Sequence, residues 1–137
     1  MKILAVDDDH AVRVSLNVMF RKWNDVVLEV AEEAQSAMEM LSKEEYFMMF
    51  CDVDMPGMDG LKLLEIVREK YPTMPVVMLT GNQDIATPIK AFRSGAMAYL
   101  QKPMQTATVR ETIDKAFEIV EKEEKKRMGI SDVEGFK

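Results

Sequence analysis

The sequence predicts an α/β fold, a doubly wound five-stranded parallel sheet with helices on both faces. Two observations carry this prediction. Short apolar runs alternate five times with longer stretches in which apolar residues recur at helical spacing. Turn residues or clusters of charged residues separate the runs from the helical stretches. Repeated strand–helix alternation is typical of a parallel sheet whose right-handed crossovers place helices on both of its faces.

The predicted strands are short and apolar throughout, as expected of strands that a parallel sheet buries on both faces. They cover residues 2–6, 26–30, 47–51, 75–79 and 97–100. With 137 residues, of which 47% are hydrophobic, the chain has the size and composition to bury one core around such a sheet.

Five apolar stripes predict the helices that follow these strands. Their members are Val12, Leu16, Met19, Phe20 and Trp23; Ala37, Met40 and Leu41; Leu61, Leu64 and Val67; Ile85, Ile89 and Phe92; and Val109, Ile113, Phe117 and Val120. Thr108 and Glu111 have the spacing of a capping box for the last helix, and Gly95 is expected to be the C-cap of the fourth. Pro88 would interrupt the fourth helix unless Thr87 is its N-cap and Pro88 its first residue.

Composition excludes several classes of function. The net charge of −6 argues against direct contact with nucleic acid, which requires a basic face. No apolar run approaches the roughly 20 residues that span a bilayer, and residues 1–6 lack the features of a signal peptide. Cys51 is the single cysteine, which fits a reducing compartment. We therefore expect a soluble cytoplasmic protein without a membrane segment.

Polar residues follow the predicted strands at their carboxyl ends, where open parallel sheets bind ligands. They are Asp7, Asp8 and Asp9 after the first strand, Asp52 and Asp54 after the third, Thr80 after the fourth and Lys102 after the fifth. If the first and third strands are neighbours, their carboxylates converge on one crevice. Each aspartate alone could instead be an ordinary helix N-cap or turn former.

Gathered carboxylates would need a cation. Two carboxylates about 4 Å apart repel by about 4 kcal/mol at an effective dielectric constant near 20. Few protein oxygens combined with several waters are typical of Mg²⁺ sites. Lys102 and Thr80 offer an ammonium group and a hydroxyl, which suit phosphate oxygens. The combination indicates phosphoryl transfer in which one carboxylate is the nucleophile.

Four motifs resemble the receiver domain of two-component response regulators. They are VDDD at 6–9, CDVDMPGMDG at 51–60, LTG at 79–81 and YLQKP at 99–103. The resemblance runs from Met1 to about Val120. It implies the flavodoxin-like strand order 2-1-3-4-5 and a receiver domain over residues 1–122. Residues 123–137 would then form a charged helix extension and a flexible tail or the start of a linker.

The resemblance also implies roles for these residues. Asp52 would accept a phosphoryl group from a sensor histidine kinase or a phosphotransfer protein. Mg²⁺ would be bound by Asp8, by Asp52 and by the backbone carbonyl of Asp54, with Asp7 acting through a metal-bound water. Lys102 and the hydroxyl of Thr80 would contact the phosphoryl group.

In such a domain the phosphoryl group biases a switch. Tyr99 would move inward with Thr80 and change a protein-binding face formed by the fourth helix, the fifth strand and the fifth helix. By this resemblance, Asp54 and Asn82 would lie where side chains tune phosphate lifetime in the family. The peptide bond between Lys102 and Pro103 would be cis.

The output of the domain is left open by the sequence. The expected partner is a downstream protein target or an effector domain, and a phosphorylation-dependent dimer is a further expectation. The chain is then a signalling domain that assists its own phosphorylation and dephosphorylation rather than an enzyme. Both a stand-alone regulator and the front end of a longer one fit the sequence.

Two rival hypotheses belong to other classes. Asp52 and Asp54 have the spacing of the acid pair in a phosphatase or phosphotransferase of the haloacid dehalogenase type. However, Pro56 stands where that motif requires Thr or Val, and the motif usually follows the first strand rather than the third. The second rival is a constitutive interaction module that retains the pocket. His10 is expected at the surface, and Cys51 is expected in the core rather than as a redox centre.

Overall fold

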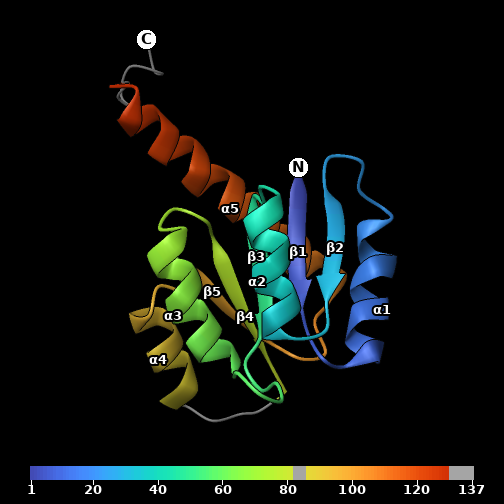
Figure 1. Ribbon diagram of the computed structural model, residues 1–137. Coiled ribbons are helices and arrows are strands. Elements are labelled where there is room, and N and C mark those ends of the chain that lie inside the picture. Colours follow the sequence, from blue (N-terminus) through green and yellow to red (C-terminus); the bar gives the residue numbers. More distant parts are fainter. Residues whose placement is uncertain (82–85, 130–137) are drawn as a thin grey trace. The chain divides into compact units, whose positions relative to one another are not determined.

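Five parallel strands form a single sheet in the part of the chain that the computed structural model describes, residues 1–81 and 86–129. The strands are β1 (Lys2–Val6), β2 (Val27–Ala31), β3 (Met48–Asp52), β4 (Val76–Thr80) and β5 (Ala98–Gln101). Their order is β2-β1-β3-β4-β5, and every neighbouring pair is parallel (Figure 1). The predicted fold class and strand order are therefore confirmed.

Most strands begin and end one residue later than predicted, and this shift matters for the site. Asp52 and Thr80 are the last residues of β3 and β4 rather than the first residues beyond them. They are still in register, Asp52 beside Leu79 and Thr80 beside Gln101. The apolar pattern missed these last residues because their side chains are polar. Their backbone N–H and C=O groups can still pair with the neighbouring strands, whatever the side chain.

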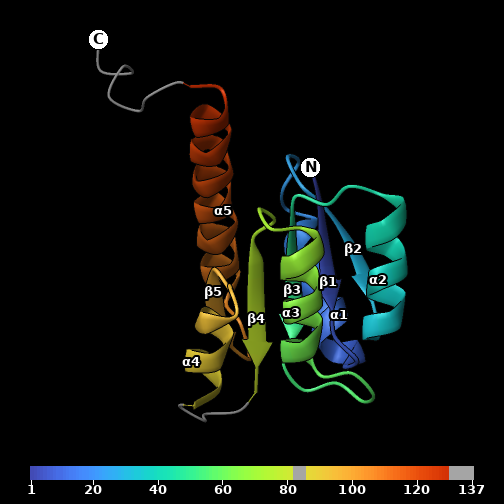
Figure 2. The same cartoon turned by 60° about the vertical axis from the view of Figure 1, so that its left-hand side comes forward.

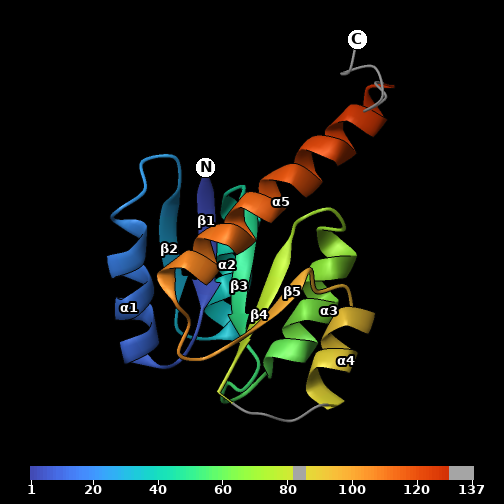
Figure 3. The same cartoon turned by 180° about the vertical axis from the view of Figure 1, so that it is seen from behind.

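The helices α1 (His10–Phe20), α2 (Ala34–Lys43), α3 (Gly60–Lys70) and α4 (Ala86–Arg93) connect the strands. Helices α2, α3 and α4 follow one another across one face of the sheet (Figure 2), where they share a core cluster with alternate residues of β1, β3 and β4. Phe50 lies between two members of that cluster, so its side chain points to the opposite face. Helix α1 lies on that face, which Figure 3 shows from behind. The ring of Phe20 from α1 meets the ring of Phe50 edge-on, with centroids 6.5 Å apart.

The chain divides into two compact units, Met1–Met104 and Gln105–Lys137. The first contains the sheet and α1 to α4, and the second contains α5 (Thr106–Arg127). The predicted boundary at residue 122 stays a prediction, and residues 130–137 of the predicted tail lie outside the described residues. Among the described helices, none combines the length and the apolarity that crossing a membrane requires.

Helix ends explain two predicted turn signals. Asp9 is the N-cap of α1, and its side chain accepts a hydrogen bond from the backbone N–H of Ala11. Gly95 follows α4 with φ of 102°, a conformation that glycine adopts without strain. The N–H of Ala96 bonds the carbonyl of Ala91, and the N–H of Gly95 bonds that of Phe92. This is a Schellman motif, and Gly95 closes α4 as predicted.

Two predicted helix starts are wrong. Helix α4 begins at Ala86, so Thr87 is not its N-cap and Pro88 is its third residue. The first-turn N–H groups of a helix have no intrahelical acceptor, and a proline there therefore removes no hydrogen bond. Helix α5 begins at Thr106 after Gln105, so Thr108 and Glu111 form no capping box. The carbonyl of Thr108 accepts a hydrogen bond from the hydroxyl of Thr112 instead.

The buried faces of two helices also differ from the predicted stripes. In α1 the buried residues include Arg13, whereas Val12 is only half-buried. In α4 the side chains of Ile89 and Phe92 are 49% and 52% exposed, whereas Ala91 is buried. Ile85, the remaining member of that stripe, lies outside the described residues. Helical periodicity thus identified both helices correctly but misplaced part of the face that each one buries.

Candidate functional site

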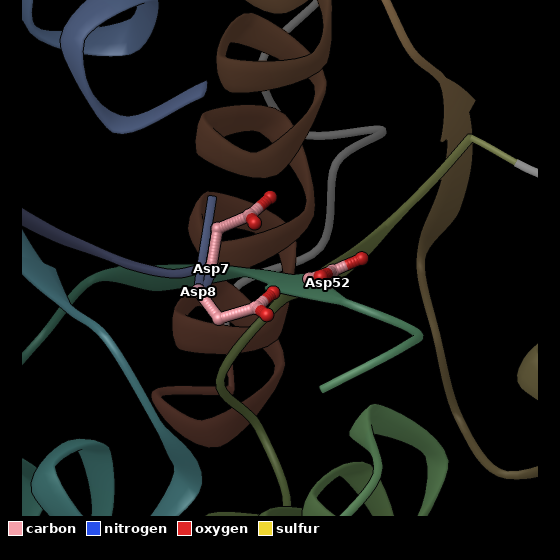
Figure 4. Close-up of side chains that lie close together, drawn as sticks. All are labelled: Asp7, Asp8 and Asp52. Carbon is pink, nitrogen blue, oxygen red and sulfur yellow. The ribbon is translucent and has the colours of Figure 1, made fainter. Parts of the chain in front are cut away.

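Three carboxylates meet at the carboxyl end of the sheet. The sheet pairs Val6 of β1 with Cys51 of β3, so the residues that come next, Asp7 and Asp52, lie beside each other. One carboxylate oxygen from each of Asp7, Asp8 and Asp52 lies within 4.8 Å of the other two. Figure 4 shows the three side chains gathered at one point from two separate segments of the chain. These carboxylates therefore lie close together, as the sequence predicted.

Lys102 follows the edge strand β5, and its side chain extends to this cluster. Its Nζ lies 2.7 Å from Oδ2 of Asp7 and 3.2 Å from Oδ1 of Asp52. Strands β4 and β3 lie between β5 and β1, so the lysine side chain reaches over their carboxyl ends. The N–H of Lys102 donates to the carbonyl of Thr80 over 2.6 Å, and the peptide bond between Lys102 and Pro103 is cis.

Burial sets the electrostatics of the cluster. Asp7 has no exposed surface, Asp52 is 4% exposed, and Asp8 is exposed. Burial and, after it, the nearby charge of Asp7 raise the pKa of Asp52 to about 6, although Lys102 and the N–H of Asp54 oppose this rise. Burial lowers the pKa of Lys102, but the hydrogen bond to Asp7 and the charge of Asp52 outweigh it, so that pKa is raised.

The cluster has one buried side and one open side. Oδ1 of Asp7 accepts a hydrogen bond from the N–H of Asp9 over 2.9 Å, and Oδ1 of Asp52 accepts one from the N–H of Asp54 over 3.3 Å. In the part of the chain that the structure describes, the carboxylate of Asp8 has neither a hydrogen bond nor an ion pair. An exposed carboxylate beside two buried ones offers oxygen ligands to a hard divalent cation that keeps several of its waters.

Gly60, which the sequence analysis did not single out as a site residue, closes the loop after β3. A Cβ atom on Gly60 would lie 1.9 Å from the backbone oxygen of Asp52. The N–H of Gly60 donates to the carbonyl of Val53 over 2.8 Å, so the loop returns directly onto the end of the strand. Next to it, Asp59 is the N-cap of α3 and accepts from the N–H of Lys62. Only glycine allows this approach, which fixes the backbone around Asp52.

The predicted switch residues, Thr80 and Tyr99, lie in β4 and β5 and are not members of the carboxylate cluster. Thr80 is 1% exposed at the end of β4. The ring of Tyr99 in β5 packs against the core cluster under α2, α3 and α4. Its hydroxyl is buried and, within the described ranges, has no hydrogen-bond partner. Asn82, which with Asp54 is expected to tune phosphate lifetime, lies outside the described residues.

Arg13 was missed as well, although its position carried a signal. It stands three residues before Leu16 in the apolar stripe of α1, and a charged residue on such a stripe is unusual unless it has a partner. Its Nη1 donates a buried hydrogen bond of 2.8 Å to the backbone carbonyl of Asp7. His10 and Cys51 lie as expected, the first exposed at the start of α1 and the second fully buried.

Comparison with known proteins agrees with this geometry. The family model described as "Response regulator receiver domain" matches residues 3–114. The DNA-binding transcriptional regulator NtrC of Proteus hauseri is 32% identical over 114 residues, which are 83% of this chain and 24% of NtrC. Chemotaxis protein CheY-3 of Vibrio cholerae is 34% identical over 120 residues, which are 86% of this chain and 92% of CheY-3. The chain thus spans about a quarter of the NtrC sequence and nearly all of CheY-3.

Solved structures give the same result. A CheY-like response regulator receiver domain protein from Methanospirillum hungatei superposes with a TM-score of 0.82 at 28% identity, over 88% of this chain and 97% of that one. NtrX from Brucella abortus superposes with a TM-score of 0.83 at 28% identity, over 90% of this chain and 28% of NtrX. Neither comparison supports a phosphatase of the haloacid dehalogenase type. The chain belongs to the response regulator receiver domain family and is a module of two-component signalling.

Proposed function

We propose that this receiver domain accepts a phosphoryl group on Asp52 from a phosphohistidine, with Mg²⁺ bound, and passes the signal to a protein partner. The observation that carries the proposal is the contact of Lys102 with both Asp7 and Asp52 beside the exposed carboxylate of Asp8. This carboxylate cluster with Lys102 combines a nucleophile, a fixed positive charge and the ligands for a divalent cation.

Asp52 is the acceptor among the three aspartates. Asp7 is completely buried and already paired through both carboxylate oxygens, so a donor cannot reach it. A carboxylate oxygen of Asp52 forms the new P–O bond while the P–N bond of the donor breaks. The released imidazole keeps its electron pair and is protonated. Lys102, 3.2 Å from Asp52, is close enough to pair with the phosphoryl oxygens after transfer.

The metal would be held by four groups of this chain. Asp8 and Asp52 would bind Mg²⁺ through their side chains and Asp54 through its backbone carbonyl, while Asp7 would contact a metal-bound water. When bound, Mg²⁺ neutralises carboxylate charge and the charge on the phosphoryl oxygens. Gly60 keeps the backbone of Asp52 in place for this arrangement.

The signal then passes through Thr80 and Tyr99. Phosphorylation adds negative charge, which Lys102 and the hydroxyl of Thr80 satisfy better in one conformation than in another. The buried hydroxyl of Tyr99, which has no partner among the described residues, supports a side chain with a second favourable position. The face that includes α4 and β5 would change with it, and the exposed Ile89 and Phe92 lie on α4.

The partners of this signal are proposals of the same kind. A sensor histidine kinase or phosphotransfer protein would supply the phosphoryl group in the cytoplasm. A downstream protein or an effector domain would read the altered face, with or without phosphorylation-dependent dimerisation. The domain would not contact nucleic acid itself. Its chemistry is limited to its own phosphorylation and dephosphorylation rather than turnover of a substrate.

Labelling with a small phosphodonor tests the proposal. Wild type, Asp52→Asn and Glu45→Gln are incubated with acetyl phosphate and MgCl₂, and intact mass is measured over time. Wild type and Glu45→Gln should gain about one phosphoryl group per molecule, whereas Asp52→Asn should gain none. Glu45→Gln is the control because it also neutralises one carboxylate, at an exposed position outside the cluster. Equal labelling of wild type and Asp52→Asn, or repeated hydrolysis of a phosphate ester, would reject the proposal.

A further inference from the structure

Arg13 holds an unusual position for a charged residue. It lies on the inner face of α1, 9% exposed, at the start of the buried stripe that continues with Leu16, Met19 and Phe20. Burying an arginine is unfavourable unless its N–H groups find acceptors, and an apolar residue would satisfy this helix face more simply. Its strongest contact is the bond of 2.8 Å from Nη1 to the backbone carbonyl of Asp7. The other contacts, to His10 at 3.5 Å and to Glu32 at 3.4 Å, are long.

The carbonyl that Arg13 binds belongs to the peptide group between Asp7 and Asp8. This peptide lies beyond the end of β1, where no N–H of a neighbouring strand in the ladder donates to its oxygen. The N–H of Asp7 still donates to the carbonyl of Ala31 over 3.1 Å, so Arg13 supplies the partner for the other backbone group of Asp7. A peptide group is planar, so fixing its oxygen also fixes the direction of the bond to the Cα of Asp8.

Asp8 depends on this peptide more than the other two aspartates do. Asp7 and Asp52 are buried, and each has side-chain contacts that orient its carboxylate. The carboxylate of Asp8 is exposed and lacks such contacts in the described part of the chain. Its distance from Asp7 and Asp52 is therefore set mainly by the backbone from which it projects.

We infer that Arg13 is a positioning residue for the cation site: by holding the Asp7–Asp8 peptide, it presents the carboxylate of Asp8 to a divalent cation. This inference rests on the proposed function, because it assumes that the three carboxylates bind Mg²⁺. Mutation of residues that contact the ligands of a metal, rather than the metal itself, typically weakens metal binding by roughly 10- to 100-fold. Arg13 should act at the lower end of this range because it holds the backbone rather than a ligand atom.

Arg68 provides a matched control. It is also a partly buried arginine whose guanidinium binds backbone carbonyls, those of Tyr71, Pro72, Met74 and Gly95. These carbonyls belong to the loops that precede β4 and β5, at the opposite end of the strands from the carboxylates. Arg68→Met therefore removes a comparable set of hydrogen bonds without touching the cation site.

Mg²⁺ affinity is measured by isothermal titration calorimetry on wild type, Arg13→Met, Arg13→Lys and Arg68→Met, together with the free energy of unfolding in EDTA. Arg13→Met should weaken Mg²⁺ binding roughly tenfold. The Mg²⁺ affinity of Arg13→Lys, which keeps one donor nitrogen, should lie between those of Arg13→Met and wild type. Arg68→Met should lose stability and bind Mg²⁺ like wild type. In metal-free protein, the backbone amide resonance of Asp8 should shift in Arg13→Met and not in Arg68→Met.

Each contrary outcome has a distinct meaning. If wild type binds Mg²⁺ and both Arg13 variants match it, the inference about Arg13 is overturned while the proposed function stands. If Arg13→Met does not fold, Arg13→Lys decides by the same comparison. If wild type binds no Mg²⁺, the proposed function fails, and the role of Arg13 toward a cation fails with it.

Discussion

Lys102 lies closer to Asp7 than to Asp52: its Nζ is 2.7 Å from Oδ2 of Asp7 and 3.2 Å from Oδ1 of Asp52. Asp7 has no exposed surface, whereas the side chain of Lys102 retains 18% exposure. The ammonium group therefore neutralises a carboxylate that water does not reach, in addition to facing the proposed acceptor. Lys102 thus has a structural role in the absence of a phosphoryl group.

Removing that charge should destabilise the metal-free protein. Lys102→Met leaves Asp7 and Asp52 without their common partner, and breaking a buried ion pair in this way costs about 3–5 kcal/mol at the upper end. We expect a loss of about 2–4 kcal/mol in urea unfolding with EDTA, part of which MgCl₂ restores. Lys62→Met, at an exposed ion pair with Glu65, should change stability by less than about 1 kcal/mol. Equal losses in the two variants would contradict a special role for Lys102.

Mg²⁺ should stabilise the fold, since a ligand of the folded state alone adds free energy by mass action. At a concentration of about 100 times its Kd, Mg²⁺ should add about 2.7 kcal/mol and raise Tm. Asp8→Asn should lose most of this gain because it removes the exposed carboxylate of the cluster. Glu45→Gln, an exposed acid before β3, should keep it. The measurement is thermal unfolding in MgCl₂ against NaCl of equal ionic strength, where an unchanged gain in Asp8→Asn would exclude this cation site.

The raised pKa of Asp52 predicts a pH dependence of stability in metal-free protein. Its folded-state pKa of about 6 exceeds the ordinary aspartate value of 3.8, so the folded state holds this proton more tightly than the unfolded state does. The stability that this proton contributes is complete below pH about 4 and is lost as pH rises through about 6. The free energy of unfolding of wild type, relative to Asp52→Asn, should therefore fall by about 2–3 kcal/mol between pH 4 and pH 7.

Asn does not titrate, so this comparison isolates Asp52 from the other acidic groups. Denaturant unfolding in EDTA at several pH values gives the difference directly. Glu45→Gln should run parallel to wild type over the same range. A difference between wild type and Asp52→Asn that does not vary with pH would show that Asp52 ionises as it does in an unfolded chain.

Gly60→Ala should be among the most destabilising substitutions that add a single methyl group to residues 1–104. The added Cβ would lie 1.9 Å from the backbone oxygen of Asp52, so the loop or the end of β3 must move. We expect a loss of about 2–4 kcal/mol together with weaker Mg²⁺ binding. Gly81→Ala is the control because a Cβ there meets no described atom within 4 Å, and its stability should change by less than about 1 kcal/mol. Similar stabilities for the two variants would contradict the observed close approach.

The sequence alone determined the fold class and the set of residues available for chemistry. Apolar runs and helical stripes depend on local periodicity, which a single segment carries by itself. The same holds for Gly95, whose role at the end of α4 depends only on the local backbone. The residues at the strand ends could also be predicted, since Asp7 and Asp52 directly follow apolar runs and Lys102 follows one after a single residue, Gln101.

Contacts between segments that are distant in sequence determine which of those residues meet and what supports them. The distance between Asp7 and Asp52 depends on strand order and register, and the reach of Lys102 depends on the path over two strand ends. The burial of Arg13 and the approach of Gly60 to Asp52 likewise involve segments that are separate in sequence. A periodic pattern records which side of a segment faces the core. It carries no information about the partner across the contact, and that partner determines the charge, geometry and affinity of the site.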